Sequence, residues 1–532
     1  MFRPMDKQLG LDEGHFWMPE TCFERLKVTW PHIFRTQVLE MIPEAEFANL
    51  YADGHGRPNF PVAILVGMSV LKEMLDLTDE ALMDSFRFDM RFHYALRLTL
   101  DDTAMAIRTL YYFRSRVVGS EAVGATFDAV VDRIIKVLNL DVSRQRKDST
   151  HIRSNMAILT RLGLFTRTME HFVDLLAKAY PDQKAALPEE IQKRYGERFG
   201  RFADAKSSEG RRRLGMAAAD LWFLVQRFRE DDAIREMLEY RLLERLLSEQ
   251  CTVGNSDDGG PPVVLKEGKD IAADSLQSPF DPDASYDGHK GVGYQVQLSE
   301  TCAPDNPIQV ITRVEVEPAH KSDQHALIPA LDDLADRGCL PDTMFSDTAY
   351  NSGANLIAAA ERGVNLMAPT PGKMDPDGIN LGHFDLDLQA LQVRACPEGQ
   401  QPIRDRVGAD GETHNLLFDV QRCGPCDLVL DCPAGKDGGR LRVQPEDIAT
   451  AFSRAREETE AFKKEYAIRA GIESTNAECK TAHGLDKVWT RELPNVTFAA
   501  TMKTLACNAK RFMRHQCAQI LGEGVKMVTN PA

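Results

Sequence analysis

The spacing of apolar positions predicts that two long parts of the chain are helical. Within residues 1 to about 120, an apolar run at 60–75 follows the turn-like GRPNFP, and Thr78 is the expected N-cap of the next helix. A second helical region is predicted from about 155 to 250, where Ala, Leu, Glu and Arg are densest. We therefore expect a helical N-terminal domain at 1–120 and a helical insertion at 155–262, which ends in the linker NSDDGGPP.

Strand patterns follow this linker. Tyr294, Val296 and Leu298 alternate with polar residues, and the next segment, PIQVITRVEVEP, is rich in β-branched residues. A helix, the short strand DTMFSDTAY, a second helix and the strand VNLMAP come next. This alternation predicts an α/β fold with a mixed sheet. Residues 371–445 contain neither period and read as an irregular, loop-rich insert, after which a last helical region begins.

Charge is distributed unevenly along the 532 residues. The net charge of −16 argues against nucleic acid, yet 461–515 contains ten Lys and Arg against five Asp and Glu. The N-terminal helices carry arginines that suit either a DNA-binding module or a docking domain. The N-terminus has no apolar signal region, and the longest apolar run, 60–71, is too short to span a bilayer. We expect a soluble, cytoplasmic protein with no membrane partner, and its eleven irregularly spaced cysteines do not suggest a disulfide framework.

The segment YAIRAGIESTNAECK carries one pattern of polar residues that suggests chemistry. On a continuous helix of about 100° per residue, Tyr466, Arg469, Glu473 and Lys480 fall within about 60° of arc. One carboxylate then lies between two cations and a phenol, as suits a metal-binding acid flanked by phosphate-binding groups. The alternative is a solvated helix face with an ordinary i,i+4 salt bridge. Gly471 lies inside this segment and could bend the stripe.

Two further acids stand near predicted strand ends. Asp148 lies in RQRKDSTHI, where we expect the strand to end at the carboxylate, and Asp347 follows the strand DTMF. Together with Glu473 they form a set of three acids able to bind two Mg²⁺ ions, with Mn²⁺ as an alternative, for phosphodiester chemistry. Asp281 and Asp283 are rivals of Asp148, although their context around a proline resembles a turn.

These motifs together resemble the DDE transposases of bacterial insertion sequences, in the branch marked by Tyr-x2-Arg-x3-Glu-x6-Lys. DSTHIRSN and DTAYNSG resemble the first and second Asp motifs, DPDASYDGHKGVGYQVQ the strand between them, and GRPNFPVAIL the helical N-terminal domain. The resemblance implies an RNase H-like catalytic domain at 140–532, interrupted by the helical insertion at 155–262 and the insert at 371–445. It also implies cleavage and joining of DNA at terminal inverted repeats, insertion into target DNA, and a homodimer that holds two ends.

Other residues receive expected roles from their reach toward this core. His289 and Lys290 precede a strand and Arg153 follows the first Asp, so we expect them to contact DNA unless they belong to solvated loops. Tyr466, Arg469 and Lys480 are expected to bind phosphates. Trp489 suits stacking on an unpaired base, but a buried aromatic is the simpler expectation. Ser149 and Thr150 are expected to cap or orient a loop at Asp148.

Four cysteines of the insert suggest a metal site of another kind. Cys423 and Cys426 form a CxxC knuckle, and Cys396 and Cys432 would complete a closed tetrahedron around a structural Zn²⁺. His414 is an alternative ligand. Free thiols are the other reading of this pattern.

The sequence leaves three functions to be separated. The first is an active transposase. The second is a DNA-binding protein that has lost activity, and the third is a nuclease that cuts without joining. The complete set of acids favours the first.

Overall fold

The computed structural model describes residues 1–5, 18–52, 58–196, 207–254, 263–372 and 378–522. Its centre is a six-stranded mixed sheet in the order β4-β5-β1-β7-β8, with β6 paired to β5. The strands β5 and β6 pair antiparallel with their neighbours, whereas β1, β7 and β8 run parallel. The mixed α/β sheet expected from the sequence is therefore confirmed. The strand bounds are Arg144–Ile152 (β1), Ser285–Asp287 (β4), Gly291–Thr301 (β5), Ile311–Pro318 (β6), Thr343–Phe345 (β7) and Asn365–Met367 (β8).

The strand β1 corrects one expectation. The strand does not end at Asp148: it continues to Ile152 and pairs with β5 along its whole later half. Pairing with β5 compensates for the poor strand propensity of RQRK, because packing and ladder partners decide strand formation more than local preference does. Ser149 and Thr150 are therefore strand residues and do not cap a loop.

The N-terminal helices share one apolar core with the sheet. This core joins buried residues of the N-terminal helices, of β5 and β6, and of the long C-terminal helix α22. Thr78 accepts a hydrogen bond from the backbone N–H of Ala81, as expected of an N-cap. The helices are α1 (Glu20–Lys27), α2 (Trp30–Ile33), α3 (Leu39–Met41), α4 (Val62–Met74), α5 (Asp79–Phe88), α6 (Met90–Leu96), α7 (Ile107–Val117), α8 (Glu121–Leu138) and α22 (Leu493–Leu521).

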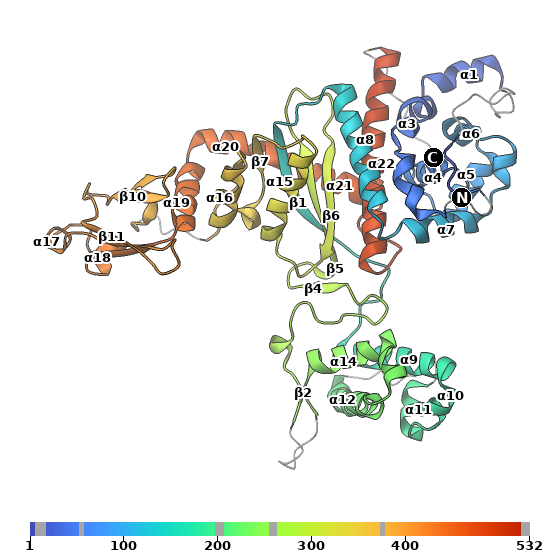
Figure 1. The fold of residues 1–532 in the computed structure, drawn as a ribbon, viewed down its shortest axis with the longest axis horizontal. Helices are drawn as coiled ribbons and strands as arrows, with labels where there is room; N and C mark the ends of the chain where they lie inside the picture. The colour runs from blue at the N-terminus through green and yellow to red at the C-terminus, as the bar shows by residue number, and fades with distance from the viewer. Residues whose placement is uncertain (6–17, 53–57, 197–206, 255–262, 373–377, 523–532) are drawn as a thin grey trace.

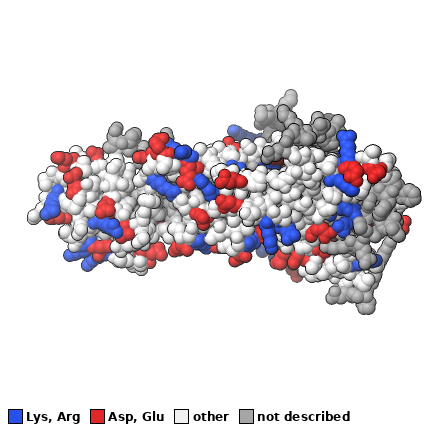
Figure 2. Space-filling model, turned by 90° about the horizontal axis from the view of Figure 1, so that it is seen from above, with Lys and Arg blue, Asp and Glu red and all other residues white. Residues whose placement is uncertain are grey.

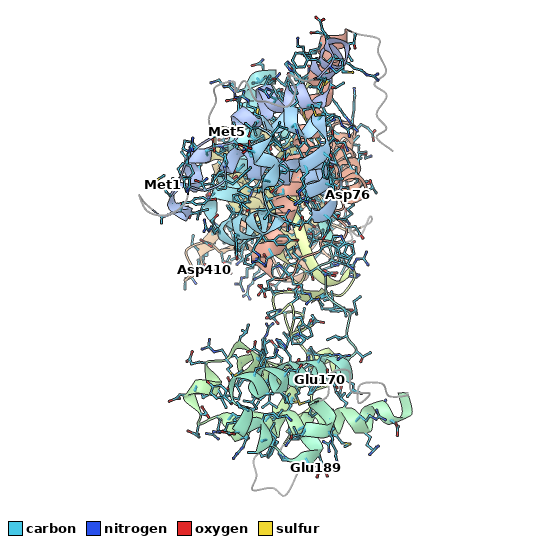
Figure 3. All side chains as sticks on the ribbon, turned by 90° about the vertical axis from the view of Figure 1, so that its right-hand side faces the viewer. Met1, Met5, Asp76, Glu170, Glu189 and Asp410 are labelled. Atoms are coloured by element: carbon cyan, nitrogen blue, oxygen red, sulfur yellow. The ribbon has the colours of Figure 1, made fainter. Side chains whose placement is uncertain are left out.

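The helical insertion forms a lobe with a core of its own. It hangs below the sheet in Figure 1, and Figure 3 shows its labelled Glu170 and Glu189 apart from Met5 and Asp76 of the N-terminal region. A pair of short strands follows its last helix. Its elements are α9 (Arg161–Ala179), α10 (Pro181–Ala185), α11 (Glu189–Tyr195), α12 (Ser207–Phe228), α13 (Asp232–Arg235), α14 (Leu238–Gln250), β2 (Cys251–Val253) and β3 (Val263–Leu265).

The insert at 371–445 is more ordered than its sequence suggests. It contains a two-stranded and a three-stranded antiparallel sheet, and Phe384, Leu416 and Phe418 are buried in a small core with Cys432. The expectation of an irregular, loop-rich insert was wrong, because strands of three or four residues are too short to show a clear period. The elements are β9 (Asp385–Asp387), β10 (Gln392–Ala395), β11 (Arg404–Val407), β12 (His414–Leu417), α17 (Val420–Cys423), α18 (Pro433–Lys436) and β13 (Arg440–Val443).

The remaining elements flank the sheet (Figure 1). The 3-10 turns η8 (Asp323–Ala326) and η9 (Thr348–Tyr350) precede the helices α15 (Leu327–Asp336) and α16 (Gly353–Glu361). After the insert come α19 (Pro445–Glu457), α20 (Glu460–Tyr466), the 3-10 segment η11 (Ala467–Ala470) and α21 (Gly471–Ala482). None of the described helices combines the length and the apolar composition that spanning a bilayer requires.

Candidate active site

The register of two parallel strands brings the first two acids together. Arg146 of β1 pairs with Phe345 of β7, and Asp148 and Asp347 each lie two residues further on. Neighbouring strands are about 4.8 Å apart, so Asp148, within β1, and Asp347, just after β7, lie at the same level. Asp347 is the N-cap of η9 and accepts a hydrogen bond of 2.9 Å from the backbone N–H of Ala349.

The third acid, Glu473, lies on α21 and is linked to Asp148 by Arg469 of η11. The guanidinium of Arg469 donates to Asp148 (Nη2–Oδ1, 3.0 Å) and to Glu473 (Nη1–Oε1, 3.1 Å). Asn476 donates to the other oxygen of Asp148 at 3.0 Å. The Glu473 side chain is 66% exposed, whereas Asp148 is buried. Because one planar guanidinium contacts both carboxylates, these lie within about 10 Å of each other.

The rivals of Asp148 have other tasks in the structure. Asp281 is fully buried and accepts hydrogen bonds from the Tyr294 hydroxyl and the Glu492 backbone N–H. Asp283 accepts one from the Leu493 backbone N–H at 2.8 Å. Both carboxylates therefore accept hydrogen bonds from backbone N–H groups at the start of α22.

The stripe of polar residues does not lie on one continuous helix, which corrects the sequence expectation. The 3-10 segment η11 separates α20 from α21, and Gly471 begins the second helix. A Cβ at Gly471 would overlap the guanidinium of Arg146, lying 2.6 Å from its Cζ. That guanidinium donates to the Ile468 carbonyl at 3.0 Å and to Glu300 Oε2 at 2.7 Å. The strand β1 thus sets the position of the helix that carries Glu473.

Burial and like charge act together on the two central carboxyls. Burial raises the pKa of Asp148, and the negative charge of Asp347 raises it further, while Arg469 lowers it. Burial likewise raises the pKa of Asp347, against the hydrogen bond from Ala349 and with a contribution from Asp323. Two half-desolvated acids that repel each other favour a bound cation, and carboxylate oxygens are ligands that Mg²⁺ prefers. The donor set therefore fits divalent metal.

Three residues predicted to bind DNA, Tyr466, Lys290 and Lys480, lie near these acids or near His151. The Tyr466 hydroxyl donates to the Ser346 carbonyl at 2.9 Å, and burial raises its pKa to about 12. The Lys290 ammonium lies 3.4 Å from Ser149 Oγ. Burial lowers the pKa of His151, and the charges of Lys290 and Lys480 lower it further, so both lysines lie near this imidazole.

Three predicted residues lie in more exposed settings. The side chain of His289 is exposed in the turn before β5, where the backbone N–H groups of 289 and 290 donate to Asp287. Arg153 forms an ion pair of 2.5 Å with Asp486. Trp489 is 75% exposed, and Lys487 Nζ lies 4.6 Å from its ring centroid. The expectation of a buried aromatic was therefore wrong.

The four cysteines of the insert line one pocket. Burial raises the pKa of Cys423, as do the thiols of Cys396, Cys432 and Cys426. The alternative ligand His414 instead forms an ion pair of 2.7 Å with Asp405 and does not line this pocket. Cysteine sulfurs bound to one Zn²⁺ lie about 3.8 Å apart. The donor types fit zinc. In the structure, however, no three of these four sulfurs lie within 4.8 Å of one another.

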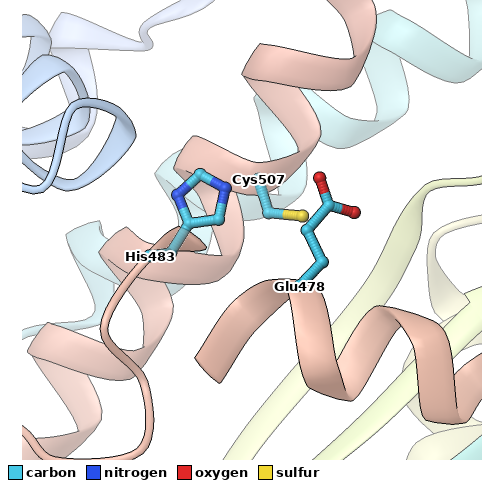
Figure 4. Close-up of side chains that lie close together, drawn as sticks. All are labelled: Glu478, His483 and Cys507. Carbon is cyan, nitrogen blue, oxygen red and sulfur yellow. The ribbon is translucent and has the colours of Figure 1, made fainter. Parts of the chain in front are cut away.

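Among the described residues, one group of three potential ligands has all its ligand atoms within 4.8 Å: Glu478, His483 and Cys507. Figure 4 shows these side chains converging from α21, the following loop and α22. Glu478 Oε2 already accepts two hydrogen bonds from Arg511, at 3.0 and 2.8 Å. His483 Nδ1 lies 3.0 Å from the Glu73 carbonyl. The half-buried guanidinium of Arg511 disfavours a metal cation beside Glu478. The group instead connects α4, α21 and α22.

Sequence reasoning missed several residues that build the site. Asn476 contacts Asp148, and the fully buried Glu300 binds Arg146, Arg511 and Thr475. Charged residues inside predicted strands were the available signal for Arg146 and Glu300, because such residues are rarely buried unless they are paired. No local pattern pointed to Asn476.

Two family models match the chain. One is described as "Transposase DDE domain" and matches residues 395–513, which include the pocket cysteines and Glu473. The other, "Transposase domain (DUF772)", matches residues 26–116. Asp148 and Asp347 lie outside both. No curated protein and no solved structure matches the chain. The chain thus carries the catalytic DDE domain of a transposase together with an N-terminal transposase domain, which makes it an enzyme of DNA transposition.

Proposed function

We propose that this transposase belongs to the insertion-sequence branch with the Tyr-x2-Arg-x3-Glu-x6-Lys signature, and that Asp148, Asp347 and Glu473 are its catalytic acids. The enzyme cleaves DNA at the terminal inverted repeats of its element and joins the ends to target DNA. The observation that supports this most is the register of β1 and β7, which sets Asp148 beside Asp347, with Arg469 linking Asp148 to Glu473.

Two Mg²⁺ ions, or Mn²⁺ in their place, would activate the attacking oxygen and stabilise the leaving one. The three carboxylates supply the ligands for them. Before metal binds, Arg469 neutralises Asp148 and Glu473. With those acids holding metal, the guanidinium would be free to form a forked contact with the phosphate being cut.

The cationic groups around the acids hold the flanking DNA. Lys290 and Lys480 lie on the His151 side of the site, and each serves a phosphate next to the scissile one. Arg153, His289 and Tyr466 extend this contact area. Lys and Arg alternate with Asp and Glu on the face seen in Figure 2, so we expect DNA to contact local basic residues instead of one broad patch.

Two further features complete the proposal. Cys396, Cys423, Cys426 and Cys432 bind a structural Zn²⁺ that stabilises the insert. Two copies of the chain form a homodimer on DNA, so that both ends of the element are held in one complex.

The acids are tested by separating cleavage from binding. With a DNA end that carries the flanking inverted repeat, Asp148→Asn, Asp347→Asn and Glu473→Gln should abolish cleavage in Mg²⁺ while affinity for DNA is retained. Lys480→Ala should instead weaken binding and reduce its salt dependence by about one phosphate contact. Normal cleavage by Glu473→Gln, together with an unchanged salt dependence of DNA affinity for Lys480→Ala, would show that the face carrying Glu473 and Lys480 is only a solvated helix surface.

The wild-type reaction separates the alternative functions. Cleavage followed by strand transfer supports the transposase. Cleavage without joining would indicate a nuclease, and binding alone would indicate a DNA-binding protein that has lost catalysis.

A further inference from the structure

A fourth carboxylate, Asp323, lies on the opposite face of β1 from Asp148. Asp148 pairs across the ladder with Leu298, and Ser149 with Gln297, so side chains of these successive pairs project to opposite faces. Asp323 begins η8, which covers the face of Ser149 and Gln297. It therefore lies close to the acids without belonging to the set that faces α21.

Both oxygens of Asp323 are engaged with this face. Oδ2 accepts a hydrogen bond of 2.9 Å from the Ser149 hydroxyl, and Oδ1 accepts one of 2.6 Å from Gln297 Nε2. Gln297 is buried, and its own oxygen accepts a hydrogen bond of 2.5 Å from the hydroxyl of Tyr350. Tyr350 is the last residue of η9, the turn that Asp347 caps. One carboxylate thus connects the strand of the first acid with the turn of the second.

The same contacts extend to a DNA-binding lysine. Because the Ser149 hydroxyl donates its proton to Asp323, its lone pairs are available to the Lys290 ammonium at 3.4 Å. Asn355 adds a second tie between η8 and η9, since its amide donates to the Gln324 and Tyr350 carbonyls, both at 2.8 Å.

We propose that Asp323 is a positioning residue of the catalytic site, which sets Asp148 and Asp347 at a metal-binding separation and directs Lys290 toward the DNA. This inference rests on the proposed function of the two acids. Polar groups that orient metal ligands typically change metal affinity by 10–100-fold when they are removed. Asn is a poorer partner than Asp323 at this position. If its amide oxygen accepts from Gln297, its N–H₂ faces Ser149, whose hydroxyl must then turn to accept it, and the negative charge of the carboxylate is lost.

The test measures Mn²⁺ binding by the full chain without DNA. The electron paramagnetic resonance signal of free Mn²⁺ reports how much of the ion remains unbound. We expect Asp323→Asn to bind Mn²⁺ about 10–100-fold more weakly than wild type. Ser149→Ala removes one of the two hydrogen bonds, so we expect a smaller loss in the same direction. Asp332→Asn is the charge control: this exposed acid pairs with Arg362 at 2.6 Å and should leave Mn²⁺ affinity unchanged.

Cleavage gives the second readout. Because a positioning residue acts through metal binding, raising the Mg²⁺ concentration should restore much of the cleavage lost in Asp323→Asn. Wild-type Mn²⁺ affinity in folded Asp323→Asn would overturn the inference. If that variant fails to fold, wild-type affinity in Ser149→Ala overturns it instead. Unchanged Mn²⁺ binding by Asp148→Asn would show that the proposed metal site itself is wrong, which is a separate failure.

Discussion

Gly471→Ala tests how β1 sets the helix of Glu473. In an ordinary helix this change stabilises by about 1 kcal/mol, because Ala has the higher helix propensity. Here the new methyl group would overlap the Arg146 guanidinium, which must leave the Ile468 carbonyl and shift from Glu300. Disrupting a buried ion pair costs about 3–5 kcal/mol. Glu300 retains Arg511 and Thr475, so we take the lower end and expect a net loss of about 2 kcal/mol.

A double-mutant cycle isolates this cause. In an Arg146→Ala background the overlap is gone, so Gly471→Ala should become stabilising by up to about 1 kcal/mol. Gly124 of α8 is a matched control, since a Cβ there meets nothing within 4 Å, and Gly124→Ala should stabilise in both backgrounds. The free energy of unfolding is measured by urea titration, alongside cleavage. An equal loss from Gly471→Ala with and without Arg146 would refute the reasoning.

Three other predictions concern the insert, the exposed tryptophan and a helix cap. Purified protein should contain about one zinc per chain, which Cys423→Ser loses and His414→Ala retains; freely alkylated thiols in the folded wild type would contradict this. Trp489→Ala should weaken binding to DNA ends with an unpaired base by about 1–3 kcal/mol while sparing fully paired duplex, as binding titrations of both substrates would show. Thr78→Ala should lower the free energy of unfolding by about 1 kcal/mol, and an unchanged urea midpoint would mean that the cap is dispensable.

The sequence predicted those features that depend on local patterns. Alternation in Tyr294, Val296 and Leu298 identified β5, and Thr78 was recognised as a cap because its role depends on residues three positions away. Asp148 and Asp347 were also expected to lie close together, because both were placed at strand ends, although β1 in fact continues past Asp148. Their register required the structure.

Features that depend on distant contacts could not be predicted. The placement of α21 depends on Arg146 of β1, whose guanidinium occupies the space beside Gly471, and the two lie more than 300 positions apart in the sequence. Asp323 is one acid among many until η8 is placed against Ser149 and Gln297. Trp489 was expected in a core because large aromatics usually bury their surface, and only the fold shows it exposed.

Arg469 occupies the position where a cation is needed, and this has a measurable consequence. Its guanidinium forms charge-assisted hydrogen bonds with both Asp148 and Glu473, so metal binding must displace it from at least one of them. Hydrogen bonds to charged groups contribute about 1.5–3 kcal/mol, and about 1.4 kcal/mol corresponds to a tenfold change in affinity. We therefore expect Arg469→Gln to bind Mn²⁺ about tenfold more tightly than wild type in the absence of DNA. Cleavage should nevertheless fall, because the forked phosphate contact is lost. Weaker Mn²⁺ binding by Arg469→Gln would instead mean that the arginine orients the acids for metal and does not compete with it.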